Sequence, residues 1–131
     1  MIGIDTNVLV RYLTQDDPVQ SAKATRLIEQ RLSEAKPGFI STVAIVETVW
    51  VLDRAYGFSA AAIASAVEQM LQADMFFVDD EQEVFTAMTA LKTGEASFAD
   101  ALIAALGKSA GCSVTATFDR KAARQTGFEL L

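Results

Sequence analysis

The stretch MIGIDTNVLV at residues 1–10 places polar side chains in the middle of the first hydrophobic run of the chain. Residues 2–4 have the short, uncharged pattern of a buried strand, and the apolar pattern at residues 7–13 predicts a helix. Between them stand a carboxylate, a hydroxyl and an amide, which are Asp5, Thr6 and Asn7. In parallel α/β sheets the ligand site lies beyond the carboxyl ends of the strands. The end of this first strand is therefore a candidate functional position.

Short uncharged runs alternate with helical patterns along the rest of the chain. We expect strands at residues 2–4, 39–41, 75–78, 113–117 and 128–131. We expect helices at residues 7–13, 18–32, 43–55 and 119–126, and further helices that begin after the N-caps Ser59, Asp80 and Ser97. Thr42 is the expected cap of the third helix. This alternation predicts an α/β fold in which a parallel sheet is covered by helices on both faces.

The composition limits the class of protein. A chain of 131 residues with 51% hydrophobic residues can bury a core as one domain, residues 1–131. Cys112 is the single cysteine, so no internal disulfide can form. The sequence shows no signal-peptide pattern and no apolar run long enough to span a bilayer, so we expect no membrane association and a soluble, cytoplasmic protein.

The charge and the missing histidine narrow the chemistry. The net charge of −6 opposes binding to nucleic acid, which normally depends on surplus lysine and arginine. The absence of histidine removes the commonest general base and the Ser-His and Cys-His mechanisms. An enzyme with this composition must use carboxylates, hydroxyls or metal ions.

Four carboxylates stand out, and each has a structural alternative. Asp5, Asp100 and Asp119 each precede or begin a predicted helix, where a carboxylate can simply cap the backbone. Glu47 lies in TVAIVETVWVL, a helix that is apolar all round, where a lone buried carboxylate is costly. Because a buried carboxylate needs a partner, we favour a functional role for Glu47.

Together the four carboxylates predict a cation site. Several carboxylates cannot stay ionised close together unless a cation holds them. Mg²⁺ and Mn²⁺ prefer oxygen ligands, and such a site needs no histidine. A bound cation would also offset the negative charge and allow contact with a phosphate group.

The chain resembles the PIN domain family, and within it the VapC ribonuclease toxins of bacterial toxin–antitoxin pairs. The resemblance covers nearly the whole length and rests on four stretches. They are IDTNVLV at 4–10, STVAIVETVWVL at 41–52, FADALIAALGKSAG at 98–111 and TATFDRKAARQTGFELL at 115–131.

The resemblance implies the fold, the site and the partners. It implies a three-layer α/β/α fold with a central parallel sheet, and an acidic catalytic quartet at Asp5, Glu47, Asp100 and Asp119. Thr6, Asn7 and Thr117 match polar residues that support such a site. Members use one or two Mg²⁺ or Mn²⁺ ions, cut single-stranded or structured RNA, form dimers and are inhibited by a cognate antitoxin protein. Some relatives carry a further acid where this chain has Ser97 with Glu95 nearby, which leaves the number of metal ions open.

The predicted reaction is metal-assisted hydrolysis of RNA phosphodiester bonds, leaving a 5′-phosphate and a 3′-hydroxyl. Asp5, Asp100 and Asp119 are the expected metal ligands, and Glu47 is either a ligand or an acceptor for the attacking water. Thr6 and Asn7 are expected to hydrogen-bond the neighbouring carboxylates and fix their orientation.

Positive side chains near Asp119 are candidates for substrate binding. Arg120 and Arg124 are four residues apart and would share one face of the predicted last helix, with Lys121 beside them. Arg11 is a further candidate. The alternative is that these charges only keep the surface soluble.

The apolar excess is large for a small monomer and favours a homodimer. The candidate residues, of which an unknown subset would lie at an interface, are Trp50, Leu52, Ile63 and Met70.

Three other functions remain open. Asp5-Thr6-Asn7 faintly resembles the nucleophilic motif of aspartate phosphatases, although the second acid of that motif is replaced by Asn7. The chain is alternatively a non-catalytic interaction module built on a PIN fold. A third alternative is an RNA-processing PIN nuclease that is no toxin.

Overall fold

The computed structural model describes residues 1–131, and the chain divides into two compact units. The N-terminal unit is Met1–Asp79 and the C-terminal unit is Asp80–Leu131. Each unit combines helices with parallel strands, so the predicted α/β class is confirmed. None of the helices combines the length and the apolar character that crossing a bilayer requires.

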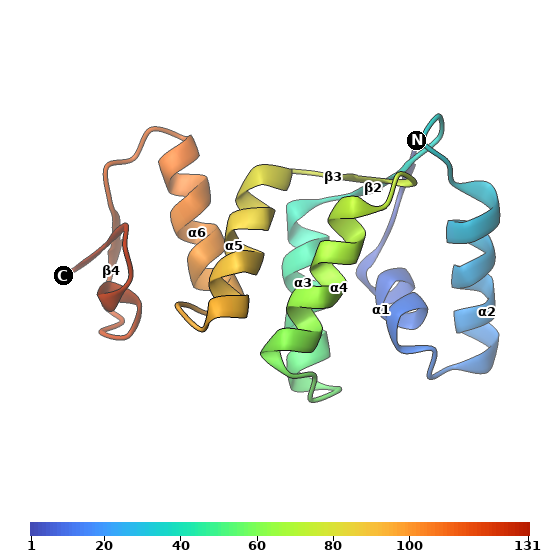
Figure 1. The fold of residues 1–131 in the computed structure, drawn as a ribbon, viewed down its shortest axis with the longest axis horizontal. Helices are drawn as coiled ribbons and strands as arrows, with labels where there is room; N and C mark the ends of the chain where they lie inside the picture. Colours follow the sequence, from blue (N-terminus) through green and yellow to red (C-terminus); the bar gives the residue numbers. More distant parts are fainter. The chain divides into compact units, whose positions relative to one another are not determined.

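The N-terminal unit contains a three-stranded parallel sheet with the strand order β1-β2-β3 (Figure 1). Ile2 is in register with Gly38, and Gly38 with Phe76. The unit consists of β1 (Ile2–Gly3), α1 (Thr6–Thr14), α2 (Pro18–Arg26), a π-helical turn η1 (Leu27–Arg31), β2 (Gly38–Ile40), α3 (Thr42–Arg54), α4 (Ala60–Gln72) and β3 (Phe76–Val78). β1 and β3 are the edge strands, so the carboxyl end of β1 lies at an open edge of this sheet.

Close packing explains the glycine that begins β2. A Cβ atom at Gly38 would lie 2.7 Å from Cδ1 of Leu32 and 2.9 Å from Cγ1 of Ile4. Both neighbours are buried core residues, so a larger residue would push β2 away from them. Gly38 therefore lets the chain that leads to α3 and Glu47 run close to the chain that leads to Asp5.

The core of the N-terminal unit comes from the apolar faces of its helices. Leu9 of α1, Ile45 of α3 and Val67 of α4 are almost completely buried. Burial of each such side chain contributes about 1.5–3 kcal/mol. Of the four apolar residues considered for an interface, Leu52, Ile63 and Met70 belong to this core, and Trp50 is exposed.

The C-terminal unit consists of two packed helices and a small parallel sheet. Its elements are α5 (Glu81–Thr93), α6 (Phe98–Ser109), β4 (Thr115–Thr117), a 3₁₀ turn η2 (Ala122–Arg124) and β5 (Phe128–Leu130). Thr115 is in register with Phe128, and Thr117 with Leu130. β4 has β5 as its one partner strand, so β4 also has an open edge.

Several local predictions were wrong at helix ends. Ser41, and not Thr42, caps α3, because the Ser41 hydroxyl accepts the backbone N–H of Ala44. Asp80 occupies the predicted N-cap position of α5, but its backbone is left-handed (φ 49°) and its side chain makes no capping hydrogen bond to the helix. The helix predicted at 18–32 changes to a π-helical turn after Arg26.

The helix predicted at residues 119–126 is a single 3₁₀ turn. Gln125 has an extended backbone that ends the turn after Arg124. A left-handed glycine, Gly127, follows and leads into β5. The segment is therefore too short to give a stable helix of its own.

Candidate active site

Asp5 follows β1 and caps α1. Its Oδ1 atom accepts the backbone N–H of Thr6 at 2.8 Å, while its backbone is extended. The side chain is exposed, and no protein group donates to its other oxygen. Asp5 thus acts as a helix cap, as the structural interpretation predicted, and still presents a carboxylate oxygen to solvent.

Thr6 connects the start of α1 with the middle of α3. Its hydroxyl donates a hydrogen bond to Oε1 of Glu47 at 2.8 Å, although the two residues are 41 positions apart. The predicted hydrogen bond from Thr6 to a neighbouring carboxylate is therefore present. The Asn7 side chain is exposed and forms no such bond, so that part of the prediction was wrong. Thr6 therefore orients the Glu47 carboxylate toward the start of α1.

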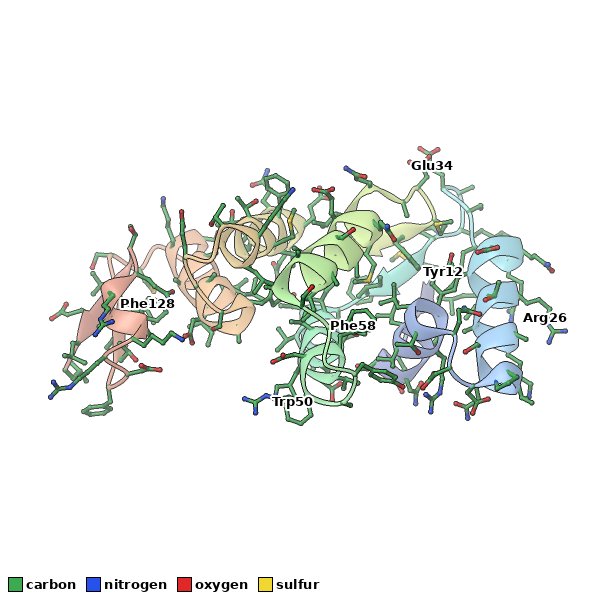
Figure 2. All side chains as sticks on the ribbon, turned by 60° about the horizontal axis from the view of Figure 1, so that its bottom comes forward. Tyr12, Arg26, Glu34, Trp50, Phe58 and Phe128 are labelled. Carbon is green, nitrogen blue, oxygen red and sulfur yellow. The ribbon has the colours of Figure 1, made fainter.

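Glu47 is exposed, and the expectation that α3 has no solvated face was wrong. Ile45 and Leu52 turn toward the core, while Val43 and Trp50 are 71% and 61% exposed. Because positions 43, 47 and 50 are spaced at i, i+4 and i+7, they share the outer side of the helix. Figure 2 shows Trp50 projecting from α3 into solvent. Glu47 thus lies between two exposed apolar residues, and burial does not explain its presence.

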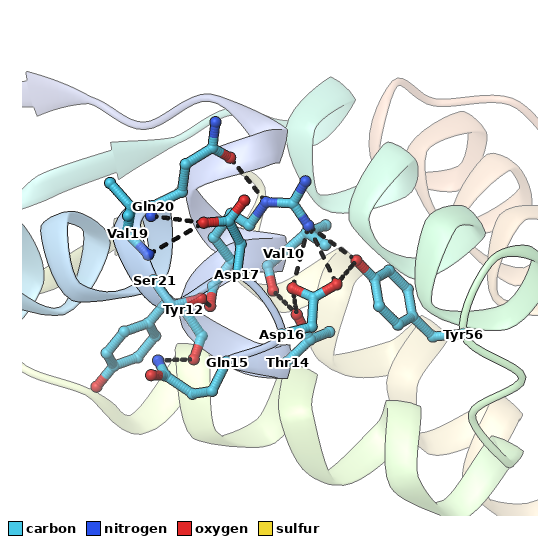
Figure 3. Close-up of polar contacts among 11 residues, drawn as sticks. Val10, Tyr12, Thr14, Gln15, Asp16, Asp17, Val19, Gln20, Ser21 and Tyr56 are labelled. Carbon is cyan, nitrogen blue, oxygen red and sulfur yellow. Dashed lines mark hydrogen bonds and ion pairs between the residues drawn. The ribbon is translucent and has the colours of Figure 1, made fainter.

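Arg11 takes part in a polar network within the N-terminal unit (Figure 3). Its guanidinium donates to Asp16 at 3.0 Å, to the Tyr56 hydroxyl at 3.0 Å and to Oε1 of Gln20 at 2.8 Å. The hydroxyls of Tyr56 and Thr14 also donate to Asp16. These hydrogen bonds, with that of Tyr56 first, and the charge of Arg11 lower the pKa of Asp16 to about 2. Arg11 therefore joins α1 to α2 and to the connection between α3 and α4.

Asp100 lies in the first turn of α6 and is half-buried. Its backbone N–H donates to the hydroxyl of Ser97, the N-cap, at 3.2 Å. The Asp100 carboxylate accepts no hydrogen bond from the backbone of Ser97, so it does not cap the helix as the structural alternative predicted. Both oxygens of Asp100 are without a protein donor.

Asp119 is held by its own turn after β4. Its Oδ1 atom accepts the backbone N–H groups of Lys121 at 2.8 Å and of Ala122 at 3.3 Å. The backbone N–H of Asp119 donates to the hydroxyl of Thr117 at 3.0 Å. Thr117 therefore fixes the backbone of Asp119, and the N–H groups of the turn use one of its two carboxylate oxygens.

The three cations after Asp119 are exposed, and none of them takes part in an ion pair. They are Arg120, Lys121 and Arg124. Because η2 is a short 3₁₀ turn, the argument that Arg120 and Arg124 share an α-helical face was wrong. Arg124 and Lys108 line a cleft of about 690 Å³ within the C-terminal unit.

The four candidate carboxylates fall into two pairs, one in each unit. Thr6 connects Asp5 with Glu47 in the N-terminal unit, whereas Asp100 and Asp119 belong to the C-terminal unit. Within neither unit do three or more carboxylate or thiol side chains gather at a metal-binding distance. The oxygens without protein donors on Asp5, Asp100 and Asp119 are nevertheless the type of ligand that a hard divalent cation takes.

Sequence reasoning missed the network around Asp16. Asp16 was not among the candidate residues, but it contacts Arg11 and Tyr56. Tyr56 lies 40 residues further along the chain, so no local pattern could have paired the two. The Thr-x-Asp spacing from Thr14 to Asp16 was the one local signal.

Comparison with protein-family models gives one result. The model of the PIN domain matches residues 2–128. No curated protein and no solved structure matches the sequence.

Proposed function

Because this chain belongs to the PIN domain family, we propose that it is a metal-dependent endoribonuclease whose two units act as one catalytic domain. PIN domains are generally nucleases, and they generally use divalent metal ions. The family match includes residues of both units, which supports a single domain over residues 1–131.

One observation carries the proposal. The hydrogen bond from Thr6 to Glu47 connects the residue after Asp5 to a carboxylate 41 positions away. Contacts between exposed side chains contribute little to stability. Stability alone therefore does not explain why Thr6, shortly after β1, holds the exposed Glu47 in place. The carboxyl end of a parallel strand is where α/β proteins bind ligands.

We assign the catalytic quartet to Asp5, Glu47, Asp100 and Asp119. Asp5, Asp100 and Asp119 supply carboxylate oxygens as metal ligands, and Glu47, oriented by Thr6, accepts a proton from the attacking water. Thr117 holds the turn of Asp119 in place. Asn7 is the remaining polar residue beside Asp5 and contributes an exposed amide.

The donor set suits Mg²⁺ or Mn²⁺, one or two per site, because every proposed ligand is a carboxylate oxygen. When bound, such an ion neutralises charge on the phosphate and makes water a better nucleophile. It also allows the carboxylates to stay ionised near one another.

The RNA phosphates are bound by side chains that have no ion-pair partner in the protein. Arg120, Lys121 and Arg124 meet this condition, whereas Arg11 is bound to Asp16. A polyanion can then bind although the whole chain has a net charge of −6. A salt titration of RNA binding tests this: affinity falls steeply with salt if the cations contact phosphates, and is nearly independent of salt if they do not.

We further propose that the nuclease is a VapC-like toxin of a toxin–antitoxin pair and works in the cytoplasm as a homodimer. The exposed Val43 and Trp50 on α3 support this, because they offer apolar surface for a protein contact. An adjacent reading frame for a short DNA-binding protein that suppresses the nuclease is the expected observation. Light scattering at the mass of a monomer would contradict the dimer.

The experiment that tests the function is cleavage of a 5′-labelled single-stranded RNA. We expect cleavage with Mg²⁺ or Mn²⁺, none with excess chelator, and products with a 5′-phosphate and a 3′-hydroxyl. Glu47→Gln should abolish cleavage. Asp53→Asn is the matched control, because Asp53 is an exposed acid of the same helix whose partner is Arg54. Equal activity of folded Glu47→Gln and the control would contradict the proposal.

A further inference from the structure

Phe118 is an aromatic side chain that the C-terminal unit leaves almost fully exposed. Its side chain is 83% exposed, more than any other large apolar residue of the chain. It stands directly between Thr117, at the end of β4, and Asp119. A ring that is exposed next to a candidate catalytic residue is free to contact a bound ligand.

Backbone hydrogen bonds hold the segment that carries the ring. The N–H of Asp119 donates to Thr117, and the N–H groups of Lys121 and Ala122 donate to Asp119. Ala122 is buried and anchors the turn. Phe118 is therefore presented by an ordered turn, so that binding a ligand costs little further backbone entropy.

The charge around Phe118 is opposite in sign to that of the whole chain. Residues 117–125 contain the cations Arg120, Lys121 and Arg124 and one acid, Asp119, whereas the whole chain has a net charge of −6. None of these cations is paired with an acid. An exposed ring among unpaired cations is complementary to an anionic ligand that carries flat apolar groups.

We propose that Phe118 stacks on an unpaired base of the RNA, next to a phosphate held by Arg120 and Lys121, and so positions a single-stranded segment at Asp119. This inference rests on the proposed nuclease function and adds a residue that selects the substrate. A base has its faces free only where it is unpaired and unstacked, so the contact discriminates against duplex RNA. It is tolerant of sequence, because every base has a π-face.

The proposal requires an aromatic ring at position 118, because apolar area alone cannot stack on a base. Leucine at position 118 would keep apolar contact with a protein partner or a second copy of this chain but could not stack on a base. Tryptophan would keep or strengthen stacking. The three variants Phe118→Ala, Phe118→Leu and Phe118→Trp therefore separate a base from a protein as the occupant.

The experiment measures binding of a fluorescein-labelled 12-nucleotide RNA by anisotropy, with all variants made in full-length Asp5→Asn protein to prevent cleavage. We expect Phe118→Ala and Phe118→Leu to bind the single strand about 5- to 100-fold more weakly, and Phe118→Trp to bind within about twofold of the parent. Binding of a duplex of the same sequence should not change. Phe85→Ala is the control, since Phe85 is a 55% exposed ring on α5 of the same unit.

A second readout uses the variant with Phe118→Trp and Trp50→Phe, whose single tryptophan is then at position 118. Its fluorescence should be quenched by single-stranded RNA and not by duplex.

Unchanged affinity in Phe118→Ala and no quenching would overturn the inference, and so would a Phe118→Leu protein that binds as tightly as the parent. If cleavage depends on Asp5 but Phe118→Ala keeps full affinity, the stacking proposal fails and the nuclease proposal stands. If Phe118→Ala weakens RNA binding but the wild-type protein cleaves no RNA, the stacking proposal stands and the nuclease proposal fails.

Discussion

The two units hold their candidate carboxylates by different means. In the N-terminal unit, Glu47 is fixed by Thr6, a residue 41 positions away. In the C-terminal unit, Asp119 is fixed by backbone N–H groups two and three residues further along its own turn. The position of Glu47 thus depends on the packing of α1 against α3, whereas the position of Asp119 depends on a local turn.

The N-terminal unit and the end of the C-terminal unit also differ in how far their apolar side chains are buried. Leu9, Ile45 and Leu52 are almost fully buried in the N-terminal unit. After Ser109, Ala122 is the one buried residue, and Val114 and Leu130 are each 45% exposed. The segment with β4 and β5 therefore gains less free energy from burial than the core of the N-terminal unit does.

The largest expected effect is on catalysis, and it tests whether both units contribute. Asp5→Asn and Asp119→Asn should each reduce the rate of RNA cleavage by about a thousandfold, because each removes a charged side chain that we propose as a metal ligand. The measurement is single-turnover cleavage with folded variants. If one of the two variants keeps full activity, the chemistry belongs to a single unit.

Stability should show the difference in burial. Leu52→Ala should lower the free energy of unfolding by about 2–5 kcal/mol, because it leaves a cavity in the N-terminal core. Val114→Ala should change it by less than about 0.5 kcal/mol, because Val114 is half-exposed. Urea unfolding followed by circular dichroism measures both. Equal effects would show that the two units are equally well packed.

A smaller effect should follow from loss of the bond that orients Glu47. Thr6→Val keeps the shape of the side chain and removes the hydroxyl, so cleavage should slow by about tenfold. Thr14→Val is a control, since Thr14 is a threonine of the same helix that bonds Val10 and Asp16 and not Glu47. Identical rates for both variants would mean that Thr6 does not orient Glu47 in the reaction.

The smallest effect concerns acid stability of the N-terminal unit. Since the folded-state pKa of Asp16 is about 2, below its ordinary value of 3.8, ionised Asp16 stabilises the protein above about pH 4, and this stabilisation is lost as the pH falls toward 2. Asp16→Asn should therefore lower the urea midpoint at pH 6, and the difference from wild type should shrink toward pH 2. Tyr56→Phe should have part of this effect. A difference independent of pH would contradict the ion-pair network.

Much of the fold could be predicted because its signals are local. Alternating apolar runs, the cap-proline pair Asp17-Pro18 and the glycine Gly94 after α5 each determine structure within a few residues. The N-cap position of Asp80 was correct, but its missing side-chain hydrogen bond and the use of Ser41 in place of Thr42 were not predictable, because both depend on the backbone conformation at the start of the helix.

The exposure of Glu47 could not be predicted, because the sequence of α3 is apolar on every side and packing alone decides which side meets solvent. The acceptor of the Thr6 hydroxyl and the partners of Asp16 are likewise set by contacts between distant segments. The capping roles of Asp5 and Asp119 were predictable, since each bonds within three residues.

The central proposal is that Asp5 and Asp119 bind the same divalent cation, and calorimetric titration of the protein with Mn²⁺ tests it most directly. Wild-type protein should bind Mn²⁺, and Asp5→Asn and Asp119→Asn should each weaken that binding by about a hundredfold or more. Asp53→Asn should bind as wild type does. Mn²⁺ affinity that is unchanged in either Asp5→Asn or Asp119→Asn would contradict the shared site.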